Sequence, residues 1–162
     1  MKVFGLAIDP ITSTPIVILK DLQEKKVVPI WIGLFEASAI ATQLEKIDLS
    51  RPMTHDLMND MLNALEVKVT RIVITDLRNN TFFAIIDMVK SGTDIMIDSR
   101  PSDAIALALR AGAPILVDET VIEKSTDINF GNRTGDLNNY TKEQLQEFLE
   151  NLSPDDFGKY KM

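Results

Sequence analysis

Hydrophobic and polar positions recur with two different periods along the chain, and the changes of period separate strands from helices. Three short runs near the start, KVFGLAI, PIVILK and KVVPIWI, are rich in branched apolar residues and predict three strands. Pro29 lies inside the third run, and proline cannot donate to a sheet, so we expect an edge strand or a bulge there. After Gly33, apolar residues at helical spacing in FEASAIATQLEKI predict an amphipathic helix packed on a sheet.

A second amphipathic helix is predicted with Thr54 as its N-cap residue. Its apolar stripe consists of Leu57, Met58, Met61, Leu62 and Leu65. The runs VKVTRIVITDL and TFFAIIDMV, joined by the turn RNN, then predict a hairpin, and TDIMIDS predicts the next strand. Further along, PILVDE predicts a short buried strand.

The segment DSRPSDAIALALRAGA, residues 98–113, predicts a helix with a well-defined start and end. A residue before proline is pushed into an extended conformation, so Arg100 is expected at the N-cap and Pro101 at the first helical position. From the third helical position the carboxylate of Asp103 can accept a hydrogen bond from the Arg100 amide. Gly112 and Pro114 follow in the usual order for a helix end.

Residues 104–111 of this helix are apolar at seven of eight positions, and four of the seven are alanine. A helix that is apolar around most of its circumference is buried on all sides. Alanine permits the close approach of another backbone, so we expect this helix to lie between the sheet and a second subunit. A homodimer is therefore predicted.

The last part of the chain predicts a mobile loop and a closing helix. Residues 127–139 are polar and rich in Asn and Gly, which is typical of a loop, and residues 141–152 combine a capping box with an apolar stripe. Strands and helices do not alternate one for one, which argues against a doubly wound sheet. We expect a single compact α+β domain over residues 1–157, with a mixed, largely antiparallel β-sheet and three to four helices, followed by a tail at 158–162.

Composition and charge narrow the functional class. The 162 residues carry a net charge of −7, which repels polyanions, so nucleic-acid binding would need a local basic surface or a metal ion. The absence of cysteine excludes disulfides, zinc–thiolate sites and thiol nucleophiles. The sequence shows neither a secretory signal pattern nor an apolar run of membrane-spanning length, so we expect a cytoplasmic protein without membrane contact.

Candidate chemistry concentrates near His55, the only histidine. The chain has no phosphate-binding glycine motif and no G-x-S-x-G motif, which argues against a P-loop hydrolase and a serine hydrolase. The dipole at a helix start favours a neutral imidazole, which suits a general base; the alternative is an exposed polar residue. Asp56 and Asp60, one helical turn apart, could hold Mg²⁺ or Mn²⁺, although a first-turn acid also stabilises a helix without any site.

Two arginines stand before prolines, and each leaves two interpretations open. Arg100 is an unusual N-cap residue, because Ser, Thr, Asn and Asp are preferred there. Its guanidinium could form a structural ion pair with Asp98 or Asp103, or bind phosphate beside the helix start. Arg51 occupies a matching position in LSRPMTHDL.

The segments PIWIGLFEASAIA, RPMTHDL, DSRPSDAIALALR and FLENLSPDDF resemble the signature segments of the bifunctional nuclease (BFN) family, over nearly the whole chain. The resemblance implies a compact α+β domain with nuclease activity on DNA and RNA. The polar residues of these motifs are then the candidate site residues: Glu36, Arg51, Thr54, His55, Asp56, Asp98, Arg100, Ser102 and Asp103.

Two functions are predicted as alternatives. The first is a metal-assisted nuclease acting on single-stranded or loosely structured nucleic acid. Its predicted catalytic residues are His55, Asp56 and Asp103, its substrate-binding residues are Arg51 and Arg100, and its ligands for a divalent cation are Asp56, Asp60 and Asp98. The second is a non-catalytic homodimeric binding or regulatory module, in which the Arg-Pro pairs hold two helices against the sheet.

Overall fold

The computed structural model describes residues 1–9 and 12–126, so the predicted loop at 127–139, helix at 141–152 and tail at 158–162 lie outside the described residues. The elements follow in this order: β1 (Lys2–Ile8), β2 (Pro15–Lys20), β3 (Val27–Trp31), α1 (Leu34–Leu44), α2 (Thr54–Ala64), β4 (Val67–Arg78), β5 (Thr81–Lys90), β6 (Thr93–Ser99), α3 (Pro101–Ala111), β7 (Ile115–Val117) and α4 (Glu119–Thr126).

The first three strands form an antiparallel sheet in the order β1-β2-β3. All three were predicted from their apolar runs. Pro29 lies in β3, opposite Ile18 of β2, and β3 is an edge strand of this sheet. The predicted edge position is therefore confirmed, since an edge strand tolerates a residue that has no backbone N–H.

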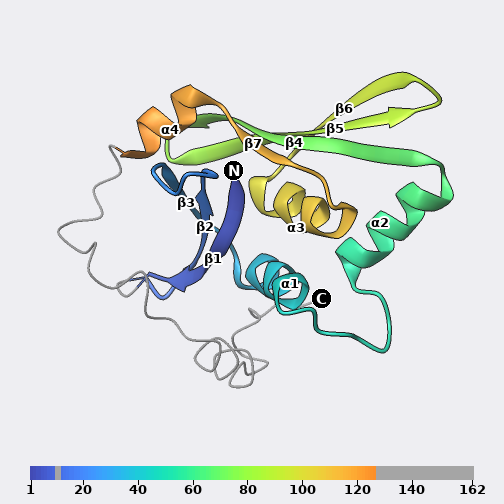
Figure 1. Ribbon diagram of the computed structural model, residues 1–162. Helices are drawn as coiled ribbons and strands as arrows, with labels where there is room; N and C mark the ends of the chain where they lie inside the picture. The colour runs from blue at the N-terminus through green and yellow to red at the C-terminus, as the bar shows by residue number, and fades with distance from the viewer. Residues whose placement is uncertain (10–11, 127–162) are drawn as a thin grey trace, which may run out of the picture. The chain divides into compact units, whose positions relative to one another are not determined.

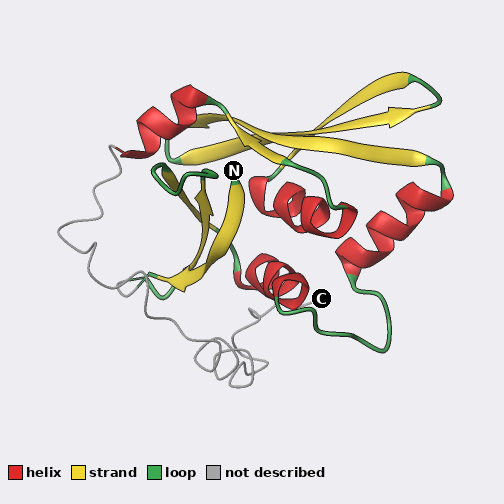
Figure 2. Cartoon of the chain, viewed as in Figure 1, coloured by secondary structure: helices red, strands yellow, loops and turns green. Residues whose placement is uncertain are grey.

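The remaining strands form a mixed sheet in the order β6-β5-β4-β7. Strands β4 and β5 are joined in the long hairpin that Figure 2 shows in yellow, and the register shifts at two places along it. Asn79 and Asn80 make the predicted turn with φ values of 48° and 60°, a left-handed conformation that asparagine adopts more readily than most residues. β7 is parallel to β4, which makes this sheet mixed.

Helix α3 is buried within a single chain. It lies between the four-stranded sheet and the helices α1 and α2 (Figure 1). Its buried residues are Pro101, Ser102, Ala104, Ile105, Ala106, Leu107 and Ala108. The predicted burial is confirmed, but the predicted neighbour is wrong, because α1 and α2 occupy the side that we assigned to a second subunit. The alanines are explained by close packing inside one molecule.

Helix α2 differs from its prediction in two respects. The N-cap residue is Met53 and not Thr54, which is the first helical residue. The apolar stripe is also largely turned outward, although such a stripe normally faces the core. Of its members, Leu62 packs against the core. Leu57, Met61 and Leu65 are each more than half exposed, and the buried residue of the helix is the polar His55.

The described residues thus form a compact α+β domain, which confirms the predicted fold class. The strands divide between two sheets, and four helices pack with them in this part of the chain. Among residues 1–9 and 12–126, no helix has the length and apolar character needed to cross a membrane.

The tight packing of α3 predicts a strong effect of added volume. Ala106→Leu, at a fully buried position, should lower the free energy of unfolding by about 1–3 kcal/mol, because the extra methyl groups cannot be accommodated without strain. Ala64→Leu, at an exposed position near the end of α2, is the control and should change it by less than about 0.5 kcal/mol. Urea denaturation measures both. Equal effects would contradict the burial of α3.

Candidate functional site

The starts of three helices bring the candidate residues together. Glu36 lies in the first turn of α1, His55 in the first turn of α2, and Asp103 in the first turn of α3. Arg100 is the N-cap residue of α3, as predicted, and Pro101 follows it at the first helical position. Helices α1 and α2 both contact α3, so these polar side chains, distant in the sequence, become neighbours.

The carboxylate of Asp103 links α2 to the start of α3. Its Oδ1 lies 3.1 Å from His55 Nε2, and Arg100 donates to it from Nε, at 2.6 Å from Oδ2, and from Nη2, at 3.2 Å from Oδ1. Asp103 therefore binds the guanidinium of Arg100. The predicted bond from the backbone amide of Arg100 to Asp103 does not form, and this helix start has no side-chain cap bond. Burial alone would raise the pKa of Asp103, but hydrogen bonds from Arg100 and His55 outweigh it and hold this pKa below its usual value.

His55 is held in one orientation by this contact. The residue is only 8% exposed, so the alternative of an exposed first-turn residue is wrong. An ionised carboxylate can only accept hydrogen bonds, and the Nε2 of His55 must therefore carry the proton that it shares with Asp103. In the neutral ring Nδ1 is then the unprotonated nitrogen, able to accept a proton. The pair has the arrangement of a base oriented by a carboxylate.

Arg100 joins a second carboxylate, from α1. Its Nη1 lies 2.7 Å from Glu36 Oε1, while about two thirds of the Arg100 side chain remains exposed. Glu36 folds back over Gly33, where an added Cβ would lie 2.3 Å from Oε2, so the glycine makes room for this carboxylate. Of the two structural ion pairs considered for Arg100, the one with Asp103 is confirmed. The helices α1 and α3 are thereby tied together at their starts.

Asp56 forms a separate ion pair with Arg110, from the last turn of α3. Arg110 Nε lies 2.5 Å from Asp56 Oδ1, and Asp56 Oδ2 accepts a hydrogen bond from the Met53 amide. Burial favours a higher pKa for Asp56, but the bonds from Arg110 and Met53 lower it below its usual value. The Arg110 side chain is only 4% exposed, and Nη1 donates to the carbonyl oxygens of Ala39 and Ala106.

The sequence prediction missed Arg110 as the ion-pair partner of Asp56. It is the single charged residue among the apolar positions 104–111, and that exception was the available signal. Its Nη2 is buried and has no hydrogen-bond partner among the described residues. An unpaired donor on a buried guanidinium lowers the stability of the fold. The hydrogen bonds from Nε and Nη1 of Arg110 must therefore hold this side chain in place.

Three predicted residues form no ion pair with this cluster within residues 1–9 and 12–126. Arg51, Asp60 and Asp98 are exposed, and the described part of the chain offers none of them an ion pair. No group of three His, Asp or Glu side chains suited to a metal ion occurs within residues 1–9 and 12–126. The two oxygens of Asp56 are already engaged, so the predicted ligands Asp56, Asp60 and Asp98 do not form a common set for a divalent cation.

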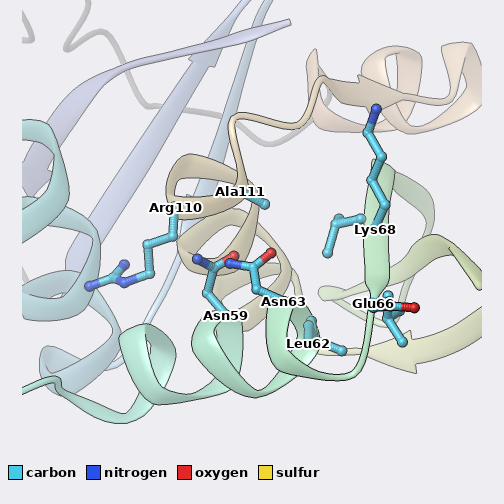
Figure 3. Close-up of a pocket in the computed structure, with 9 residues that line it drawn as sticks. Asn59, Leu62, Asn63, Glu66, Lys68, Arg110 and Ala111 are labelled. Atoms are coloured by element: carbon cyan, nitrogen blue, oxygen red, sulfur yellow. The ribbon is translucent and has the colours of Figure 1, made fainter.

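A polar hollow of about 360 Å³ lies between α2, the start of β4 and the end of α3. Figure 3 shows the amides of Asn59 and Asn63 side by side, directed toward α3, with Glu66 and Lys68 beyond them. The guanidinium of Arg110 points away from Lys68, toward α1. The lining residues come from three elements and share no motif, so the sequence does not indicate this hollow.

The Asp56–Arg110 pair should contribute strongly to stability. Asp56→Asn should lower the free energy of unfolding by about 3 kcal/mol, because it leaves the charge of a buried guanidinium unpaired. Asp60→Asn, one turn further along α2 and exposed, should change it by less than about 0.5 kcal/mol. Urea denaturation compares the two variants. If they cost the same, the ion pair does not hold α2 on α3.

Asp103 should make stability depend on pH in the acidic range. Because its pKa is lowered in the folded chain, it contributes stability above its unfolded pKa of about 3.9, and this contribution is lost as the pH falls through the folded pKa. Asp103→Asn should be less stable than the wild type at pH 7, and the difference should shrink on acidification. A difference that stays constant from neutral pH to about pH 3 would refute this linkage.

Comparison with known proteins places the chain in a family. The family model described as "Bifunctional nuclease domain" matches residues 17–129. Two uncharacterized proteins of Mycobacterium tuberculosis, from the strains CDC 1551 / Oshkosh and H37Rv, are each 35% identical to this chain over 161 residues. The alignments cover 97% of this chain and 96% of each relative. Glu36, His55, Arg100 and Asp103, which form the cluster, all lie inside the matched range, and the chain belongs to the bifunctional nuclease domain family.

Proposed function

We propose that the protein is a nuclease that hydrolyses phosphodiester bonds of DNA or RNA at the cluster of His55, Asp103 and Arg100. Membership of the bifunctional nuclease domain family supports the reaction class. The observation that carries the choice of residues is the contact between His55 Nε2 and Asp103, beside an arginine with an exposed guanidinium. A base that takes a proton from water and a cation that stabilises the charge on the phosphate both promote hydrolysis of a phosphodiester.

In the proposed reaction, His55 acts as the general base. Its Nδ1 takes a proton from a water molecule while the water oxygen forms a bond to phosphorus and the bond from phosphorus to the leaving oxygen breaks. The leaving oxygen takes a proton from solvent, and the imidazolium returns its proton to solvent afterwards. Asp103 orients the ring and stabilises the imidazolium through Nε2. Water is the nucleophile because DNA has no 2′-hydroxyl to serve in its place.

Arg100 is the proposed phosphate-binding residue. Asp103 and Glu36 fix its guanidinium at the surface, and its remaining N–H groups are available to non-bridging phosphate oxygens. Two carboxylates surround this one cation, and the whole chain carries a charge of −7. Substrate capture should therefore be weak and, because a single cation contacts the phosphate, only slightly sensitive to salt. Single-stranded or loosely structured nucleic acid is the proposed substrate.

A divalent cation is not assigned a step in this reaction. The predicted ligands Asp56, Asp60 and Asp98 do not fit a shared cation, since Asp56 is engaged by Arg110 and the other two are exposed and unpaired within the described residues. Metal dependence stays a prediction, and the assay below tests it with Mg²⁺, Mn²⁺ and EDTA.

The second candidate is a non-catalytic, homodimeric binding or regulatory module. Two observations favour it. The charges of Glu36, Arg100, Asp103, Asp56 and Arg110 are satisfied by one another, as in a purely structural network. Helix α2 also presents apolar side chains to solvent, which is typical of a surface that binds another chain.

Degradation of labelled single-stranded RNA and DNA decides between the two. His55→Ala and Asp103→Asn should each lower the cleavage rate by about 10²–10⁴-fold, because each removes the proton acceptor or its orientation. The matched control is Asp94→Asn, which removes an exposed carboxylate of β6 and should leave the rate unchanged. Cleavage with Mg²⁺, with Mn²⁺ and with EDTA establishes whether a cation is required.

Two results would refute the nuclease proposal. One is cleavage of equal rate in the wild type, His55→Ala and Asp103→Asn, which would identify a contaminating nuclease. The other is the absence of cleavage by a folded wild-type chain in all three buffers, which would favour the binding module.

A further inference from the structure

A continuous apolar ridge runs along the outer side of α2. Met53, Leu57, Met61 and Leu65 follow one another at intervals of four residues, from the N-cap to the C-cap of the helix. Each is between 51% and 57% exposed, and Met58 beside them is 38% exposed. Side chains four residues apart stack along one line of a helix, so these four form a single ridge, here called the α2 ridge.

The exposure of the α2 ridge is imposed by contacts on the opposite side of the helix. His55 points inward to Asp103, and Asp56 binds the buried Arg110. Rotation of α2 about its axis would bury the ridge against α3, but it would also break both contacts and leave the charge of Arg110 unpaired. The core formed by residues 1–9 and 12–126 therefore cannot cover this ridge while the cluster is intact.

We propose that the α2 ridge binds the α2 ridge of a second copy of this chain, around a two-fold axis. Ridges built from steps of four residues pack into the grooves beside the same ridges of another helix, which is the commonest form of helix packing. An identical helix supplies the same ridge and the same grooves, so the contact is self-complementary. Methionine adapts its shape to an irregular partner surface, and the ridge contains two methionines.

The charge of α2 favours this partner over a charged one. Between Thr54 and Ala64 the helix has no lysine or arginine, so a nucleic acid finds no cation on it. Its acids are Asp56, which is paired with Arg110, and Asp60. A basic protein would thus find only the carboxylate of Asp60 on this helix. A second apolar ridge would instead bury the apolar side chains of both ridges away from water, which is the larger gain.

The available area agrees with a weak to moderate dimer. Ile47 and Leu49, in the loop between α1 and α2, are two further apolar residues that are each 47% exposed. One helical ridge is a small surface beside the roughly 800 Å² that each partner buries in a standard interface. We therefore expect a dimer with a dissociation constant on the order of micromolar.

Sedimentation of the full chain tests the proposal. The wild type should change from monomer to dimer as its concentration rises through the micromolar range. Leu57→Glu should raise the dissociation constant by at least about 100-fold, because it places a charge in the apolar contact. Leu22→Glu is the matched control, at another exposed leucine, in the connection between β2 and β3, and should leave the dimer unchanged. Circular dichroism should show both variants folded, since both side chains face solvent.

Cross-linking identifies the surface independently of affinity. The chain has no cysteine, so a single substitution places one thiol at a chosen position. A two-fold axis through the middle of the ridge brings Leu57 or Met61 close to its own copy. Leu57→Cys or Met61→Cys should form a disulfide-linked dimer under mild oxidation, and Leu22→Cys should not.

Three outcomes would overturn the proposal: a wild-type chain that stays monomeric up to about 100 µM, a Leu57→Glu variant that dimerises like the wild type, or equal cross-linking of the ridge and control cysteines. The experiments contain no nucleic acid, so they are independent of nuclease activity.

Discussion

The polar side of α2 that carries His55 and Asp56 faces the interior, and the rest of the structure depends on this constraint. Two of its first-turn residues, His55 and Asp56, reach Asp103 and Arg110 on α3. These contacts place a proton-accepting imidazole beside an exposed arginine, and the same rotation of the helix turns its apolar side to solvent. The candidate site and the candidate association surface are therefore two consequences of one helix orientation.

Asp103 determines what the cluster can do chemically. Its carboxylate holds the proton of His55 on Nε2 and binds the guanidinium of Arg100, so one acid orients both the base and the cation. Glu36 adds a second negative charge at Arg100. The two interpretations of Arg100 are therefore not exclusive: its ion pairs fix its position structurally, and about two thirds of its side chain stays exposed.

Much of the fold follows from local patterns in the sequence. Runs of branched apolar residues predicted the strands, Pro29 predicted an edge strand or a bulge, and Arg100–Pro101 predicted the start of α3, because each depends on a few neighbouring residues. Which side of α2 faces the core could not be predicted in this way. Its apolar stripe has the usual spacing, but the buried charge of Arg110, 54 residues further along, outweighs the burial of that stripe.

The sequence predicted which residues form the candidate site but not which of them contact one another. Motifs indicated His55, Arg100 and Asp103, and the structure shows which of them touch, whereas Arg51 and Asp98 form no ion pair with them in the described part of the chain. The most direct test of the account is the NMR signal of the imidazole of His55, which is unambiguous because the chain has one histidine. We predict a slowly exchanging Nε2 proton at neutral pH that disappears in Asp103→Ala; a rapidly exchanging ring proton in the wild type, or a proton on Nδ1 alone, would contradict the inward orientation of α2.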